Sequence, residues 1–218
     1  MKPDEYGDLT VVVPARDAAP TLAATLRSVL DGADGLLELV VVDDGSLDGT
    51  AEVAAGLGDE RVRVLTGRGA GPAAARNDGV AAARGALVGF SDADDLWTAG
   101  RPDPRRAGLV AGRPVLARGL AQVAWAGRDV GAPGVLPSFS SVLVPVEVLR
   151  AHPLDEGLLR GEDVEWFLRV ADHGVAVVDV DAVVFRYLRR PGSLSGDPHA
   201  GLLAGLGATV RRRRAGAP

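Results

Sequence analysis

Acidic residues gather in three short clusters that could bind a metal, a hydroxyl-rich ligand or a proton. The clusters are Asp43-Asp44-Gly45-Ser46, Asp92-Ala93-Asp94-Asp95 and Glu162-Asp163. Three carboxylates within four residues repel one another unless a cation or a hydroxyl-rich ligand lies among them. The second cluster therefore favours Mg²⁺ or Mn²⁺ held together with phosphate oxygens, whereas the first, taken alone, is also typical of a turn that caps a helix.

A glycine-rich stretch, Gly67-Arg68-Gly69-Ala70-Gly71-Pro72, precedes Arg76. Backbone amides without obstructing side chains, with a guanidinium near a helix start, suit an anion such as diphosphate. The G-x-G-x-G spacing differs from the dinucleotide-binding fingerprint, and the acidic residue that completes that fingerprint is missing. The stretch therefore predicts a phosphate contact rather than a dinucleotide site.

Composition narrows the classes of function. The chain has 218 residues, of which 47% are hydrophobic and 24% charged, and 24 basic residues against 29 acidic ones give a net charge of −5. These values argue against a disordered chain and against a nucleic-acid-binding protein. The absence of cysteine excludes a disulfide scaffold, a thiol nucleophile and cysteine-bound zinc. Any metal must be a hard cation bound by oxygen.

The elements that must position these clusters alternate between strands and helices. Continuous apolar, β-branched runs predict strands buried on both faces, and helical periodicity follows each of the first three strands. This α/β order predicts a mostly parallel, doubly wound Rossmann-like sheet with its ligand beyond the carboxyl ends of the strands. The expected strands are 9–13, 37–42, 62–65 and 86–90, and the expected helices are 21–30, 50–57 and 73–83.

After Trp97 the pattern becomes less regular, without a linker long enough to separate a second domain. We expect one domain over 1–218, with a nucleotide-binding half (9–97), a smaller acceptor-side and catalytic half (98–195) and a helical tail (196–218). Within the second half, acceptor specificity is expected in 98–139. The expected elements there are a helix over 162–171 and two strands over 175–178 and 183–187, while the short apolar runs at 115–116, 123–125 and 141–144 are less regular.

Five motifs occur together in an order that resembles the metal-dependent family 2 glycosyltransferases of the GT-A fold. The similarity is close from Leu9 to Trp97 and returns from Ser140 to Ser195. The chain's only asparagine, Asn77, lies within one of the motifs. The motifs are Val11-Val12-Val13-Pro14, Glu38 to Ser46 with Asp48-Gly49-Thr50, Gly71 to Asn77, Gly85 to Trp97, and Gly161-Glu162-Asp163.

The resemblance implies roles for individual residues. Asp163 would be the base that removes the proton of the acceptor hydroxyl, and Asp94 would ligate the metal. Asp92 would hold the ribose and share the metal. Asp44 would bond the nucleobase or ribose, and Arg76 would reach the base or the diphosphate. The other residues expected at the substrates are Pro14, Ala15, Arg16, Asp43, Gly45, Ala93, Trp97, Glu162 and Arg190.

Two departures from the family pattern fall at the expected site. Arg16 and Asp17 stand where the family usually has an aromatic residue and asparagine, so the Arg16 guanidinium is expected to stack on the base. Arg190 stands where many relatives have a histidine, which completes the metal site in some of them. Because arginine cannot ligate a cation, we expect Arg190 to contact the diphosphate instead.

The sequence thus predicts an inverting glycosyltransferase of the hexosyltransferase type, which moves one sugar from a nucleoside diphosphate sugar to a hydroxyl acceptor. Two alternatives stay open. A nucleotidyltransferase needs a glycine-rich loop directly after the first strand, and Pro14 to Pro20 contains no glycine. A non-catalytic nucleotide-sugar-binding protein would keep the pocket without turnover.

The partners follow from the same prediction. We expect UDP as the nucleotide of the donor and a glycan or a lipid-linked acceptor, with no nucleic acid and no transmembrane segment. Whether the chain forms a homodimer is left open by the sequence. The acidic start of the chain and the lack of a long apolar run predict a cytoplasmic protein. Contact of Arg211 to Arg214 with the inner membrane face is the alternative to a solvated tail.

Overall fold

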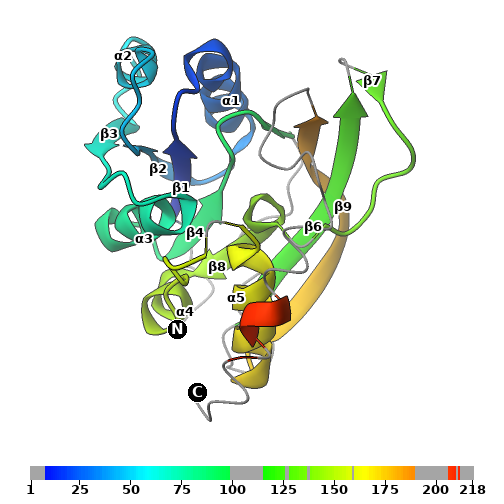
Figure 1. The fold of residues 1–218 in the computed structure, drawn as a ribbon. Helices are drawn as coiled ribbons and strands as arrows, with labels where there is room; N and C mark the ends of the chain where they lie inside the picture. The colour runs from blue at the N-terminus through cyan, green and yellow to red at the C-terminus, as the bar shows by residue number, and fades with distance from the viewer. Residues whose placement is uncertain are drawn as a thin grey trace.

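The computed structural model describes residues 8–98, 115–125, 128–136, 138–158, 160–189, 206–209 and 211. Its strands form one sheet in the order β3-β2-β1-β4-β8-β6-β9-β5, and β7 pairs with β6 at the rim. Helices cover both faces of this sheet (Figure 1). The α/β class expected from the sequence is confirmed.

The N-terminal half forms the parallel part of the sheet. β1 pairs with β2 and β4, and β2 pairs with β3, all in parallel register. The strands and helices lie within a few residues of the ranges predicted from apolar runs and helical periodicity. Their bounds are β1 Leu9–Ala15, α1 Ala19–Gly32, β2 Leu36–Asp43, α2 Thr50–Ala55, β3 Val62–Thr66, α3 Pro72–Ala82 and β4 Leu87–Phe90.

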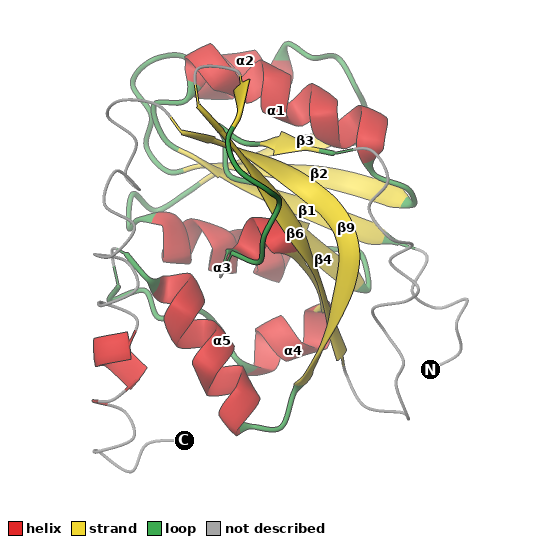
Figure 2. Ribbon diagram, turned by 90° about the vertical axis from the view of Figure 1, so that its right-hand side faces the viewer, coloured by secondary structure: helices red, strands yellow, loops and turns green. Residues whose placement is uncertain are grey.

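Alternate residues of these strands belong to two separate hydrophobic cores. Val11 and Val13 of β1 pack with Leu22 of α1, whereas Val12 lies in the second core with Ala75 of α3. Figure 2 shows α1 and α2 on one face of the sheet and α3, α4 and α5 on the other. Burial of both strand faces explains why these strands read as unbroken apolar runs.

The close packing of α3 against β1 depends on a glycine. A side-chain carbon at Gly79 would lie 2.3 Å from Val12 Cγ1, well inside van der Waals contact. Only the absence of a side chain lets the helix lie this close to the strand. The neighbouring residues of α3 are thereby held at a fixed height above the sheet.

The C-terminal half extends the sheet with longer strands than the sequence predicts. β8 joins β4 and β6 in antiparallel register, β6 pairs with β9 in parallel, and β5 pairs with the far edge of β9 in antiparallel register. The bounds are β5 Leu96–Trp97, β6 Val115–Trp125, β7 Arg128–Asp129, the 3₁₀ helix Phe139–Ser141, β8 Val142–Pro145, α4 Val146–Ala151, α5 Glu162–Asp172 and β9 Ala176–Arg189.

The prediction of two separate strands over 175–178 and 183–187 is wrong, because β9 is one continuous strand. β6 is likewise continuous across the apolar runs at 115–116 and 123–125. The pairing of β6 with β9 shifts register near Gly119 instead of ending there. A side-chain carbon at Gly119 would lie 2.2 Å from Val184 Cγ1, so the glycine allows the two strands to pass closely at the irregularity. The polar residues Asp179 and Asp181 therefore interrupt the apolar pattern without interrupting the strand.

Parts of the expected C-terminal region fall outside the described residues. They include Arg190 and Arg212 to Arg214, while residues 206–209 are helical. Among the residues that the structure describes, no helix has both the length and the hydrophobicity needed to cross a membrane.

Candidate active site

The carboxyl ends of β1 and β2 are joined by hydrogen bonds between their loops. The Asp44 amide donates to the Ala15 carbonyl at 2.8 Å, which continues the β1–β2 pairing beyond the strands. The Asp17 amide donates to Ser46 Oγ at 2.9 Å, and Asp17 Oδ1 accepts from the Leu47 amide at 2.9 Å. These bonds hold Asp17 at a positive φ of 48°, unusual for a residue with a side chain. Asp17, which departs from the family pattern, is thus held in an ordered loop by hydrogen bonds.

The neighbouring residues that the sequence assigns to the nucleotide lie on this rim. Arg16 and Gly45 are exposed, Pro14 is partly buried, and Ala15 lies in the core. Asp43 Oδ1 accepts from the Ser46 amide at 3.0 Å, so this carboxylate caps its own turn. A ligand on this rim can reach the exposed Arg16 and Gly45 without moving the backbone.

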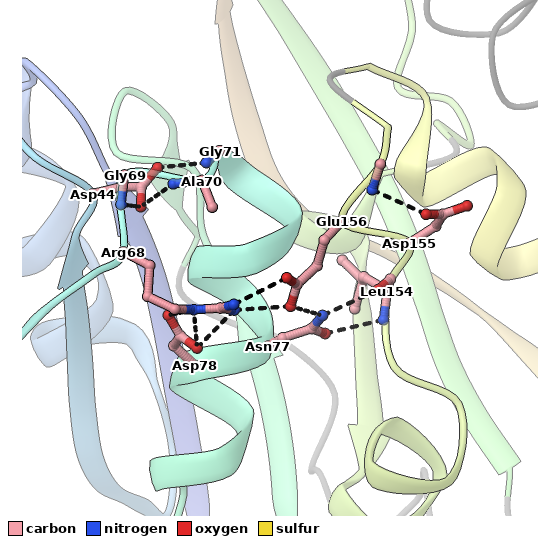
Figure 3. Close-up of polar contacts among 11 residues, drawn as sticks. Asp44, Arg68, Gly69, Ala70, Gly71, Asn77, Asp78, Leu154, Asp155 and Glu156 are labelled. Atoms are coloured by element: carbon pink, nitrogen blue, oxygen red, sulfur yellow. Dashed lines mark hydrogen bonds and ion pairs between the residues drawn. The ribbon is translucent and has the colours of Figure 1, made fainter.

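Asp44 has a different arrangement from the one expected. Its carboxylate accepts hydrogen bonds from the amides of Gly69, Ala70 and Gly71 at 2.8, 3.2 and 2.7 Å (Figure 3). The residue is 3% exposed, and a side-chain carbon at Gly67 would lie 2.9 Å from Asp44 Oδ1. The amides expected to contact a diphosphate are therefore bonded to a carboxylate of the chain itself.

The second acidic cluster connects β4 to β5. The Ser91 amide donates to the Val12 carbonyl at 3.1 Å, which continues the β1–β4 pairing and places the cluster beside the carboxyl end of β1. Asp95 is buried, and its Oδ1 accepts from the Leu188 amide of β9 at 3.1 Å. Asp92 and Asp94 are partly buried, while Ala93 between them packs into the core. Asp95 therefore anchors the loop, whereas Asp92 and Asp94 lie closer to solvent.

Arg76 links the second acidic cluster to the third. Its two terminal nitrogens donate to Asp92 Oδ1 and Glu162 Oε1, each at 2.7 Å. The guanidinium is buried and lies 5.5 Å from the centre of the Phe139 ring, and its Nε has no partner among the described residues. Burial alone would lower the pKa of Arg76, but the charges of Asp92 and Glu162 outweigh this effect and raise it. The Arg76 guanidinium is held between two carboxylates, and its contact with a donor stays a prediction.

Asp163 lies at the start of α5, beside this ion-paired group. Gly161 precedes the helix at a positive φ of 76°, and the Val164 amide donates to Asp163 Oδ1 at 2.7 Å. Burial and the negative charge of Glu162 raise the pKa of Asp163 to about 7. A carboxylate with a pKa near neutrality is suited to general base catalysis, because it is ionised at about pH 8 yet more basic than an ordinary aspartate.

The acidic residues suit a cation only if a ligand completes its coordination. Within the described parts of the chain, no three acidic or histidine side chains cluster in a way that could hold a metal by themselves. Mg²⁺ commonly binds to one or two carboxylates together with substrate phosphates. Asp94 and Asp92 supply the oxygen ligands that such an incomplete site would use.

The sequence also favoured Trp97 as a substrate contact, but its ring lies in the core. Trp97 is 4% exposed, and its amide donates to Ser28 Oγ at 2.9 Å. A side-chain carbon at Gly89 would lie 3.0 Å from the edge of the ring, so the indole fills the space above that glycine. The bulk of the ring stabilises the fold and leaves little surface for a sugar. Arg190 lies outside the described residues.

A polar network beside the site was not predicted from the sequence (Figure 3). Arg68 forms ion pairs with Asp78 and Glu156, at 3.0 and 2.8 Å. Asn77 donates to Glu156 Oε1 at 3.0 Å and to the Leu154 carbonyl at 3.0 Å. The only available signal was the position of Asn77 directly after Arg76 within a family motif.

The fold defines the structural class. The mostly parallel sheet with helices on both faces is a GT-A type fold. Solved structures agree: S. aureus TarS 1-349 in complex with UDP aligns with a TM-score of 0.68 at 18% identity, over 84% of this chain and 61% of TarS 1-349. The complex of TarS 1-349 with UDP-GlcNAc gives 0.69 at 18% identity, over 87% and 61%.

Residues 10–102, a little over two fifths of the chain, match the family model described as Glycosyl transferase family 2. The succinoglycan biosynthesis protein ExoO of Rhizobium meliloti (strain 1021) is 40% identical over 104 residues, which are 47% of this chain and 29% of ExoO. The Escherichia coli UDP-Glc:alpha-D-GlcNAc-diphosphoundecaprenol beta-1,3-glucosyltransferase WfgD is 35% identical over 94 residues, 43% of this chain and 37% of WfgD. The matched segments thus span less than two fifths of either relative.

Proposed function

We propose that this chain transfers a single sugar from a nucleoside diphosphate sugar to an acceptor hydroxyl, with inversion at the anomeric carbon. The observation that carries the proposal is Asp163, a carboxylate with a pKa near 7 at the start of α5, next to the Arg76 ion pairs. One domain then has a donor side, 9–97, and an acceptor side in the rest of the chain.

The proposed reaction uses Asp163 as the general base. Its carboxylate accepts the proton of the acceptor hydroxyl while the hydroxyl oxygen attacks the anomeric carbon. The bond from that carbon to the diphosphate oxygen breaks, and the electron pair leaves with the nucleoside diphosphate. Attack from the face opposite the leaving group inverts the configuration. A positioned base of this kind contributes roughly 10²- to 10⁴-fold to the rate.

We propose UDP as the nucleotide, supported by the UDP and UDP-GlcNAc complexes of the structural neighbour TarS. The exposed Arg16 would lie against the base at the β1–β2 rim, and Asp44 would hold the glycine-rich loop in shape. For the acceptor we propose a glycan or lipid-linked sugar. The names of the relatives, a succinoglycan biosynthesis protein and a glucosyltransferase acting on a diphosphoundecaprenol-linked sugar, support this class.

We further propose that Mg²⁺ or Mn²⁺ binds with the donor, through Asp94 and Asp92. Bound there, the cation would neutralise the charge that develops on the leaving diphosphate. Arg76 holds Asp92 through a 2.7 Å ion pair, so the orientation of this carboxylate is set before the donor arrives. Preorganised charges of this kind need no rearrangement during the reaction.

The test measures release of UDP from a panel of UDP-sugars, with Mn²⁺ and with or without glycan acceptors. Asp163→Asn keeps the shape of the side chain and removes its basicity, so we expect donor binding to survive while transfer falls at least about a hundredfold. Asp172→Asn, on an exposed residue at the other end of α5, is the matched control. Unchanged transfer by Asp163→Asn would show that another group is the base. UDP binding by the wild type without any turnover would favour the non-catalytic binding protein.

A further inference from the structure

Three consecutive residues of α3 contact three different parts of the molecule. Arg76 binds the acidic residues Asp92 and Glu162, Asn77 binds Leu154 in the segment that precedes α5, and Asp78 pairs with Arg68 in the glycine-rich loop. This helix therefore lies between the donor side of the site and the chain that leads to Asp163. Gly79, packed on Val12, fixes its height above the sheet.

The contact of Asn77 with Leu154 resembles a pair of strand residues. The side-chain nitrogen Nδ2 donates to the Leu154 carbonyl at 3.0 Å, and Oδ1 accepts from the Leu154 amide at 3.0 Å. Leu154 is 4% exposed and belongs to the core beneath α3 and α5. Two opposed hydrogen bonds to one buried residue fix both its position and its orientation. An amide side chain is required, because only an amide offers a donor and an acceptor side by side.

Arg68 and Glu156 complete the network on the solvent side. The Arg68 guanidinium donates from Nη1 and Nη2 to Glu156 at 3.1 and 2.8 Å, and from Nε to Asp78 at 3.0 Å. Glu156 Oε1 also accepts from Asn77 Nδ2 at 3.0 Å. Half of the Arg68 side chain is exposed, so these ion pairs add little to global stability. Their geometry, however, ties the glycine-rich loop to the segment before α5, as Figure 3 shows.

We propose that Arg68, Asn77, Asp78 and Glu156, here named the α3 clamp, are positioning residues for Asp163. The clamp holds residues 154–156 at a fixed distance from α3, and the chain then enters α5, where Glu162 and Asp163 lie. Because the same helix holds Asp92 through Arg76, the clamp fixes the base relative to the donor-binding loop. This inference rests on the proposed function. Misplacement of a catalytic group by about 1 Å can cost up to a hundredfold in rate.

The kinetic test compares clamp variants with a matched ion-pair variant. Asn77→Asp removes both donations from Nδ2 and places a carboxylate against Glu156. We expect kcat to fall about tenfold, with the KM for the donor changed less than about twofold. Glu156→Ala should behave alike, and Glu156→Gln, which still accepts hydrogen bonds, should retain more activity. Arg61→Ala breaks a partly exposed ion pair with Asp59 just before β3, outside the site, and should leave both constants unchanged.

A second measurement does not depend on activity. Hydrogen exchange of the amides in 154–158 and 162–166 should be faster in Asn77→Asp and Glu156→Ala than in wild type, and unchanged in Arg61→Ala. Exchange that is unchanged in the clamp variants, or equally faster throughout the protein, would overturn the proposal, as would a kcat within about twofold of wild type in an active enzyme. A wild type that transfers no sugar would contradict the proposed function, and exchange alone would then decide whether the clamp orders the start of α5.

Discussion

Replacing Asp163, the proposed base, should make the folded protein more stable above about pH 7. The pKa of Asp163 is about 7 in the folded chain against an ordinary value of 3.8, because burial and Glu162 disfavour its charged form. Each pKa unit corresponds to about 1.4 kcal/mol, so a shift of roughly three units destabilises the folded state by at most about 4 kcal/mol above pH 7. Asp163→Asn removes this penalty and keeps an oxygen for the Val164 amide.

The sign of the pH dependence follows from the raised pKa. Below about pH 4, Asp163 is protonated in the folded and unfolded chains, so the penalty is absent. Between about pH 4 and 7 only the unfolded chain loses the proton, and the wild type loses stability relative to Asp163→Asn. Above about pH 7 the difference stays constant. We expect the variant to gain about 2 to 4 kcal/mol at pH 8 and to gain nothing at pH 3.5.

The assay is urea unfolding of the wild type, Asp163→Asn and the control Asp172→Asn at pH 3.5, 5.5 and 8. A stability difference between wild type and Asp163→Asn that is the same at pH 3.5 and 8 would refute the argument, as would a variant less stable than wild type at pH 8. Transfer by the wild type should rise with pH through about 7 as Asp163 ionises. A flat pH profile would point to another base.

Three further predictions concern other residues of the candidate site. Arg76→Met should cost about 3 to 5 kcal/mol in urea unfolding at pH 7, because it leaves the buried carboxylate of Glu162 and that of Asp92 without their partner. Asp44→Ala should cost about 1 to 3 kcal/mol in the same assay, since three loop amides lose their acceptor. Asp94→Ala should abolish the enhancement of UDP binding by Mn²⁺ in calorimetry and leave metal-free binding unchanged.

Each of these predictions has a result that contradicts it. An Arg76→Met protein as stable as wild type would show that the two carboxylates find other partners. An Asp44→Ala protein with unchanged stability would mean that water satisfies the loop amides equally well. Unchanged metal dependence after Asp94→Ala would remove Asp94 from the cation site.

The parallel half of the fold could be predicted from sequence because its signals are local. Apolar runs such as 37–42, followed by helical periodicity, indicate the strands and helices without knowledge of their partners. The full lengths of β6 and β9 could not be predicted in this way, because each strand mixes apolar and polar residues across an irregular register near Gly119. Their continuity depends on pairing with each other, which no local window of sequence contains.

The acidic clusters of the site could be predicted for the same reason, since strand ends mark where ligand-binding loops begin. The hydrogen-bond partners of the residues in the site could not be predicted. Arg76 meets Glu162 across 86 residues of sequence, and Asp44 meets Gly71 across 27. Residue type alone could not tell a diphosphate from a carboxylate of the chain as the anion at these amides. The distinction needed the three-dimensional arrangement.

The contact of Asp44 with the glycine-rich loop has a consequence for the direction in which a nucleotide can bind. The amides of Gly69, Ala70 and Gly71 already hold an anion that is covalently part of the protein. A phosphate group arriving there meets a tethered competitor and a like charge, both of which oppose it. For the proposed donor, this end of the site therefore favours the neutral nucleoside over the diphosphate. In that polarity the diphosphate would lie toward Asp92 and Asp94, where the proposed cation would offset the like charges.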